Sequence, residues 1–153
     1  MILFCDTSAL VKLYILEDSS RDMQTLAGVA SAIAVCRIAW AEMMAALARR
    51  AREFPNDADA IEVVRKRLRT DWPRYVVVEL TQALVELAGE YSDTFALRGY
   101  DSVHLAAART LQDMAGEEIQ FACFDTRLGK AARMLGMPGS ARLGSPRPLR
   151  CET

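Results

Sequence analysis

Four acidic residues in the chain stand beside apolar segments, where they could hold a divalent metal ion. They are Asp6, Glu42, Asp101 and Asp125. A carboxylate next to a buried apolar run is costly unless it is paired or bound to a cation. A bound Mg²⁺ ion would use carboxylate oxygens, clamp phosphate oxygens and activate a water for in-line attack. The four acids therefore indicate metal-dependent phosphodiester hydrolysis, although an acid in the first turn of a helix can also do no more than pair with the helix dipole.

The basic residues closest to these acids in the sequence could neutralise only part of their charge. They are Lys12, Arg37, Arg98 and Arg127. Arg98 lies just before Asp101 and is a candidate for contact with a phosphate. His104 is the only histidine and follows Asp101 by three residues, on roughly the same helix face. It could be a general base or a ligand, but its apolar neighbours favour a packed or capping side chain.

The elements that must position the acids are short apolar strands that alternate with helices. We expect strands at residues 2–5, 32–38, 75–80 and 119–124. We expect helices after the possible caps at 7–8 and 18–20, and then over 40–54, 58–68, 82–91, 101–114 and 128–135. This alternation predicts an α/β fold with a short parallel sheet covered by helices on both faces. Ligand sites in such sheets gather beyond the carboxyl ends of the strands, so Asp6 and Asp125 converge if their strands are neighbours.

Length and composition fit one globular domain. The chain has 153 residues and is 52% hydrophobic. We expect a nuclease domain over residues 1–136 and a Gly/Pro/Arg-rich tail over 137–153. No apolar run approaches the length of a membrane span, and the first six residues do not resemble a signal peptide, which predicts a cytoplasmic protein. The cysteines are scattered without a C-x-x-C pair, which argues against a zinc ribbon or a disulfide scaffold.

Basic residues are concentrated in two stretches, although the net charge is −1. Residues 49–74 contain eight basic and five acidic side chains, and residues 127–153 contain six basic and one acidic. The clusters at 49–52 and 65–69 are equally consistent with solvated helix faces and with RNA binding, and they could also meet an acidic protein segment. The charge pattern permits an RNA partner without establishing one.

Four short motifs resemble those of PIN-domain proteins, specifically the VapC-type toxin ribonucleases of prokaryotic toxin–antitoxin pairs. They are ILFCDTSALVK at residues 2–12, AEMMAAL at 41–47, YDSVHLAAA at 100–108 and FDTRL at 124–128, with two alanines at 131–132. Each motif is short, but all four occur in the family's order and at spacings typical of a small domain. The resemblance extends from residue 2 to about residue 135.

The resemblance implies a PIN-like domain that depends on Mg²⁺ or Mn²⁺ and cuts structured RNA, such as transfer or ribosomal RNA, endonucleolytically. The four acids match the family's acidic metal-site positions. Ser8 matches a small hydroxyl residue that orients Asp6 or a bound water, and Arg98 is then a candidate RNA contact. The resemblance also implies a homodimer and a cognate VapB-type antitoxin whose tail covers the active site.

One residue departs from the family pattern. Two positions before the last acid the family usually has Thr or Ser, and this chain has Cys123. A thiol is a poorer hydrogen-bonding group than a hydroxyl, which leaves the orientation of Asp125 less fixed. Two alternatives stay open: a non-catalytic PIN-like subunit that binds protein, and a nuclease that acts on DNA.

Overall fold

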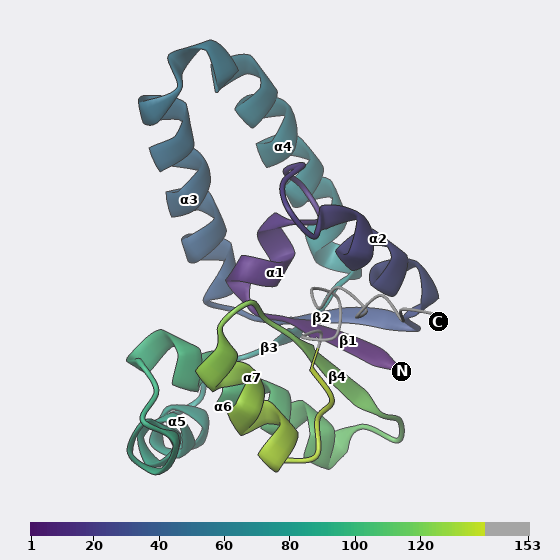
Figure 1. The fold of residues 1–153 in the computed structure, drawn as a ribbon, viewed down its shortest axis with the longest axis vertical. Coiled ribbons are helices and arrows are strands. Elements are labelled where there is room, and N and C mark those ends of the chain that lie inside the picture. The colour runs from purple at the N-terminus through teal and green to yellow at the C-terminus, as the bar shows by residue number, and fades with distance from the viewer. Residues whose placement is uncertain (140–153) are drawn as a thin grey trace, which may run out of the picture.

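A four-stranded parallel sheet runs through the centre of the protein, with helices on both of its faces (Figure 1). The computed structural model describes residues 1–139. The strands are β1 (Ile2–Cys5), β2 (Ala32–Cys36), β3 (Val76–Val78) and β4 (Ile119–Ala122). Their order in the sheet is β3-β2-β1-β4, and every neighbouring pair is parallel. The predicted α/β fold is confirmed.

Two layers of helices cover the sheet, as Figure 1 shows. One face carries α1 (Thr7–Val11), α2 (Ser20–Val29), α3 (Ala39–Glu53) and α4 (Ala58–Asp71), with the 3₁₀ turns η1 (Pro55–Asp57) and η2 (Trp72–Arg74) at the ends of α4. The other face carries α5 (Gln82–Phe95), α6 (Gly99–Met114) and α7 (Thr126–Met134). Helices α3 and α4 form an antiparallel hairpin that projects away from the sheet.

Strand β1 is apolar throughout because it lies in the interior of the sheet and packs on both sides. All four of its residues are buried. Phe4 points to the side of α6, where its ring stacks on that of Phe121 at a centroid distance of 5.6 Å. Leu3 and Cys5 point to the opposite side and join a core with Leu10 and other apolar residues of the α1–α4 layer. Strands buried on both faces read as continuous apolar runs, which is why the sequence predicted this one.

Local signals set several element ends. The Thr81 hydroxyl accepts a hydrogen bond from the Leu84 amide and caps α5. Pro55 follows α3, and Gly136, with φ of +81°, follows α7. The predicted strands at 32–38, 75–80 and 119–124 end two residues too late, because the last residues of each prediction already turn toward the next helix. Ile38, for example, occupies the N-cap position of α3.

The end of the described chain continues along β4. Met137 is fully buried, and the Phe121 amide donates to the Pro138 carbonyl at 2.9 Å. Residues 137–139 of the predicted tail thus pack on the sheet, because they add backbone hydrogen bonds beside β4; the rest of that tail, 140–153, lies outside the described residues. Within residues 1–139, no helix combines the length and apolar character that crossing a membrane requires.

Candidate active site at the carboxyl edge of the sheet

Asp6 and Asp125 leave the sheet at the same edge because their strands are neighbours. β1 and β4 pair in parallel, with Cys5 opposite Ala122. Asp6 follows β1 directly and its amide donates to the Ala122 carbonyl at 3.1 Å. Both acids then occupy N-cap positions, Asp6 for α1 and Asp125 for α7. Parallel strands therefore deliver two carboxylates to one edge, and two short helices fix their side chains.

Glu42 and Asp101 reach the same region from the first turns of α3 and α6. A cavity of about 650 Å³ is lined by Glu42, Arg98 and Asp101. A second cavity of about 710 Å³ is lined by Arg98, Asp101 and Asp125. Asp101 and Arg98 line both cavities, so they join the other two acids into one acidic surface. Asp101 is also close enough to Asp6 to act on its pKa. The region that contains all four acids is called the acidic edge below.

Asp6 is held by groups on its own helix turn. Only 5% of the residue is exposed. Its Oδ1 accepts hydrogen bonds from the Ser8 hydroxyl at 2.7 Å and from the Ala9 amide at 2.9 Å. Burial raises the pKa of Asp6, and the charge of Asp101 acts in the same direction, while the bonds from Ser8 and Ala9 oppose the rise. A cation at this edge would favour the ionised form.

Glu42 is held by two side chains from other segments. Its Oε1 accepts a hydrogen bond from the Thr7 hydroxyl at 2.8 Å and lies 2.6 Å from Nε2 of His104. Burial opposes the ionisation of Glu42, but the hydrogen bonds from His104 and Thr7 and the attraction to His104 outweigh it and lower the pKa. Glu42 is therefore an ionised carboxylate in a fixed orientation.

In each of the remaining two acids, too, one carboxylate oxygen accepts a hydrogen bond. Asp101 accepts from Nε of Arg98 through Oδ2 at 3.1 Å. Asp125 accepts from the Leu128 amide through Oδ1 at 2.8 Å. Within residues 1–139, the hydrogen bonds to all four acids fall on a single carboxylate oxygen each, so each acid has a second oxygen to offer.

These open oxygens suit a hard divalent cation, since Mg²⁺ and Mn²⁺ prefer carboxylate oxygens. Over the part of the chain that the structure describes, no three His, Cys, Asp or Glu side chains converge closely enough to form a preassembled metal centre. Like charges repel, and each acid is drawn to its own protein donor. The donor set fits Mg²⁺ or Mn²⁺ in chemistry, and binding would require the open oxygens to turn toward one point.

Of the basic residues expected to neutralise this edge, only Arg98 pairs with one of the four acids. Lys12 pairs with Glu17. Arg37 pairs with Glu79, and Arg127 donates to the Ala96 carbonyl. Arg127 and Lys130 nevertheless line the cavity that Asp101 and Asp125 share, so this part of the acidic edge also presents basic side chains.

Cys123, the departure from the expected hydroxyl, lies among three of the acids. Its thiol contacts the Asp125 carbonyl at 3.6 Å. Burial, together with the charges of Asp6, Asp125 and Asp101, raises its pKa to about 12, so the side chain is a neutral thiol rather than a thiolate ligand. The side chain of Asp125 is oriented by the Leu128 amide, which removes the need for a hydroxyl at position 123 to orient it.

Comparison with known proteins identifies the family. A family model described as the PIN domain matches residues 3–134. Over 135 residues the chain is 32% identical to ribonucleases VapC45 and VapC49 of Mycobacterium tuberculosis, a match that covers 88% of this chain and 92% of each relative. The chain belongs to the PIN-domain family and, within it, to the VapC type.

Solved structures share the PIN fold at low sequence identity. A toxin–antitoxin complex from Klebsiella pneumoniae matches with a TM-score of 0.59 at 19% identity, over 82% of this chain and 88% of that one. VapBC2 from Rickettsia felis, bound to a DNA fragment from its promoter, matches with a TM-score of 0.61 at 14% identity, over 91% and 97% of the two chains. These similarities support the fold. In this fold the acidic edge lies at the carboxyl ends of the parallel strands.

Sequence reasoning assigned no role at this edge to Thr7, and for His104 it favoured a packed or capping side chain over a general base or a ligand. His104 is buried, with 2% exposed, as the sequence analysis favoured, but its Nε2 is bonded to Glu42 rather than only packed. The available signal was a polar residue inside the apolar run at 103–108, the same type of signal that drew attention to the acids. Its partner, 62 residues away, could come only from the fold.

Proposed function

We propose that this PIN domain is a metal-dependent endoribonuclease, acting in the cytoplasm as the toxin of a type II toxin–antitoxin pair. The observation that carries the proposal is the acidic edge itself. Four carboxylates from four separate segments line one edge of the sheet, and the described residues donate hydrogen bonds to only one oxygen of each. The two relatives named as ribonucleases support RNA as the substrate class.

In the proposed mechanism, Asp6, Glu42 and Asp101 would hold the main Mg²⁺ or Mn²⁺ ion, and Asp125 would help to complete the site. When bound, the ion supplies polarisation of the scissile phosphate and a lower pKa for the attacking water. Ser8 holds the Asp6 carboxylate, and no side-chain nucleophile is needed.

Arg98 is the proposed contact for an RNA phosphate. Its side chain is 82% exposed and lines both cavities of the acidic edge. Its Nε is bonded to Asp101, while the guanidinium has further N–H groups that can donate to a phosphate. An arginine beside the acids would draw the RNA backbone toward carboxylates that otherwise repel it.

The experiment that tests the activity is cleavage of transfer and ribosomal RNAs with Mg²⁺, Mn²⁺ or EDTA, with Asp101→Asn beside the wild type. Asp113→Asn is the matched control, because Asp113 lies on the same helix, pairs with Arg109 and is exposed. Discrete cuts that need metal, vanish in Asp101→Asn and persist in Asp113→Asn would support the proposal.

The rivals predict other outcomes in the same assay. A protein-binding subunit cuts no RNA under any metal condition. A DNA nuclease prefers single-stranded DNA when both nucleic acids compete. Cuts that survive Asp101→Asn would count against the site assignment.

The proposed partners are a second copy of the chain and a small VapB-type antitoxin. The solved structures that share the fold include a toxin–antitoxin complex and a VapBC complex, which supports an antitoxin. Sedimentation of the purified protein should give twice the monomer mass. Purification of the tagged chain from its native host should recover a small protein that blocks RNA cleavage, and recovery of the chain alone in active form would argue against the antitoxin.

A further inference from the structure

We propose that His104 is a positioning residue of the active site, which holds Glu42 so that one carboxylate oxygen faces the metal. The inference rests on the proposed function, because it concerns the same metal site. It is carried by the contact of His104, Thr7 and Glu42, which come from α6, α1 and α3.

The hydrogen-bond geometry fixes the role of each atom. His104 Nε2 lies 2.6 Å from Glu42 Oε1, and the Thr7 hydroxyl donates to the same oxygen at 2.8 Å. A carboxylate oxygen only accepts, so the histidine hydrogen that makes this contact is on Nε2. Two donors from different helices therefore meet at Oε1, and Oε2 accepts no hydrogen bond from the described residues.

The surroundings of the other ring nitrogen, Nδ1, indicate that the contact with Glu42 is the main polar interaction of His104. Nδ1 is buried and has no hydrogen-bond partner within residues 1–139. An unpaired buried polar atom costs free energy that a leucine at the same position would not cost. The bond to Glu42 is the interaction that offsets this cost, and it is made by one nitrogen only.

The network also connects the segments of three acids. Thr7 directly follows Asp6, and His104 lies about one turn after Asp101 on α6. A glutamate side chain has three rotatable bonds, and ordering them at the moment of metal binding costs entropy. Because Thr7 and His104 order Glu42 in advance, the cation meets one carboxylate whose Oε1 is already held, and less of the side-chain entropy of Glu42 is lost on binding.

The test is Mn²⁺ affinity, measured by electron paramagnetic resonance titration of the purified full chain without RNA at one neutral pH. Three variants separate the bond from the bulk of the ring. The amide nitrogen of glutamine reaches about as far as Nε2, whereas that of asparagine reaches only to the level of Nδ1. We expect His104→Gln to stay within about threefold of the wild-type Kd, and His104→Asn and His104→Leu to weaken it by about 10–100-fold.

A purely structural role predicts a different order, because the loss of Mn²⁺ affinity would then follow the loss of thermal stability and not the position of the donor. Cleavage gives a second readout: in His104→Leu the half-saturating Mn²⁺ concentration should rise by a similar factor, while the rate at saturating Mn²⁺ stays within a few-fold of wild type. Equal Mn²⁺ affinity of wild type and His104→Leu would overturn the inference and leave the proposed function standing.

Two further variants keep the inference testable if the His104 variants fail to fold. Thr7→Val removes the second donor to Oε1 and should weaken Mn²⁺ binding, whereas Thr7→Ser should retain it. Unchanged binding in Thr7→Val would count against a held Glu42. If the wild type binds no Mn²⁺, or binds it equally in Glu42→Gln, the metal site of the proposed function is wrong and the inference fails with it.

Discussion

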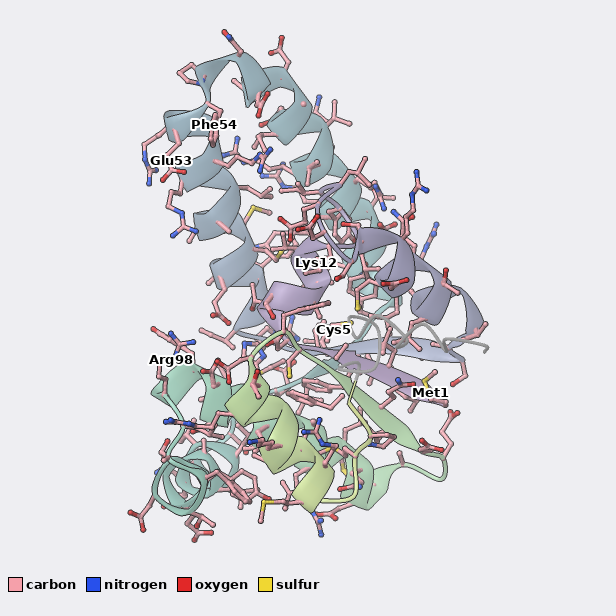
Figure 2. The ribbon with its side chains drawn as sticks, viewed as in Figure 1. Met1, Cys5, Lys12, Glu53, Phe54 and Arg98 are labelled. Carbon is pink, nitrogen blue, oxygen red and sulfur yellow. The ribbon has the colours of Figure 1, made fainter. Side chains whose placement is uncertain are left out.

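The acidic edge and the α3–α4 hairpin both carry many charges, but the protein holds those charges in different ways. At the acidic edge Glu42 has partners that are distant in sequence: Thr7 is 35 residues away and His104 is 62 residues away. On the exposed side of the hairpin an ion pair is local, since Arg65 pairs with Glu62 one turn away. Figure 2 shows Glu53 and Phe54 near the far end of the hairpin, well removed from Cys5 and Arg98.

The charges in the two regions therefore differ in how firmly their positions are fixed. Exposed ion pairs such as that of Arg50 and Asp57 contribute about 0–1 kcal/mol each, so the hairpin charges are free to change without loss of the fold. The four carboxylates at the acidic edge are buried or half-buried, and each accepts a hydrogen bond from a defined donor. Substitutions in the two regions should therefore differ in kind as well as in size.

The largest contrast should come from one residue type on one helix. Glu42 lies in the first turn of α3 and Glu53 is its last residue. We expect Glu42→Gln to lower the rate of RNA cleavage by about 10³-fold, or about 4 kcal/mol, because it removes a charged metal ligand. Glu53→Gln should leave the rate within about twofold. Equal effects of the two variants in a single-turnover cleavage assay would contradict a special role of Glu42 in cleavage.

The next contrast lies within the hairpin and concerns stability. Leu68 on α4 is fully buried in the core that covers the sheet, whereas Val63 on the same helix is 66% exposed. Leu68→Ala should lower the free energy of unfolding by about 2–5 kcal/mol through the cavity it leaves. Val63→Ala should change it by about 0.5 kcal/mol or less. Urea unfolding measures both, and a small loss for Leu68→Ala would show that the hairpin is not anchored in the core.

A smaller effect, an increase in the free energy of unfolding, is expected for Asp6→Asn. The pKa of Asp6 is raised in the folded protein, so the stability linked to its protonation is fully present below the unfolded-state pKa and is lost as pH rises through the folded-state pKa. Asp6→Asn carries no charge and keeps an oxygen for the bonds from Ser8 and Ala9. In EDTA at neutral pH the variant should be more stable than the wild type.

The pH dependence supplies the check on this prediction. Urea unfolding of wild type and Asp6→Asn should converge as the pH falls below the ordinary carboxyl range. Asp113→Asn, at an exposed carboxylate on α6, controls for the loss of one negative charge as such. A wild type that matches Asp6→Asn at neutral pH would mean that burial of Asp6 carries no cost.

The smallest effect should come from exposed arginines. Arg98→Ala, in a Glu42→Gln background that prevents cutting, should weaken RNA binding by about 3–10-fold and reduce the salt slope by about 1. Arg65→Ala is the control from the hairpin, since Arg65 is paired with Glu62. Equal losses for the two variants in a filter-binding assay would extend the RNA surface onto the hairpin, and an unchanged slope for Arg98→Ala would remove Arg98 from the site.

Local patterns predicted the elements and much of the acidic edge. The sequence predicts Asp6 and Asp125 directly after two strands, because buried apolar runs depend on neighbouring residues. Pairings across the fold could not be predicted in this way. The pairing of Arg37 with Glu79, 42 residues away, depends on a chain path that composition does not encode, and so does the contact of His104 with Glu42.

The position of β1 between β2 and β4 has a consequence for protein synthesis. Ile2 on β1 lies opposite Ile119 on β4, so the sheet is complete only when β4 has paired with β1. A growing chain that has emerged only as far as α6 carries Asp6, Glu42 and Asp101 but lacks both β4 and Asp125. Because domains fold as units while the ribosome delivers them from the N-terminus, the acidic edge is assembled only after β4 has emerged. For a nuclease whose proposed substrates include transfer and ribosomal RNA, we expect each new copy to stay inactive until β4 and Asp125 have been made.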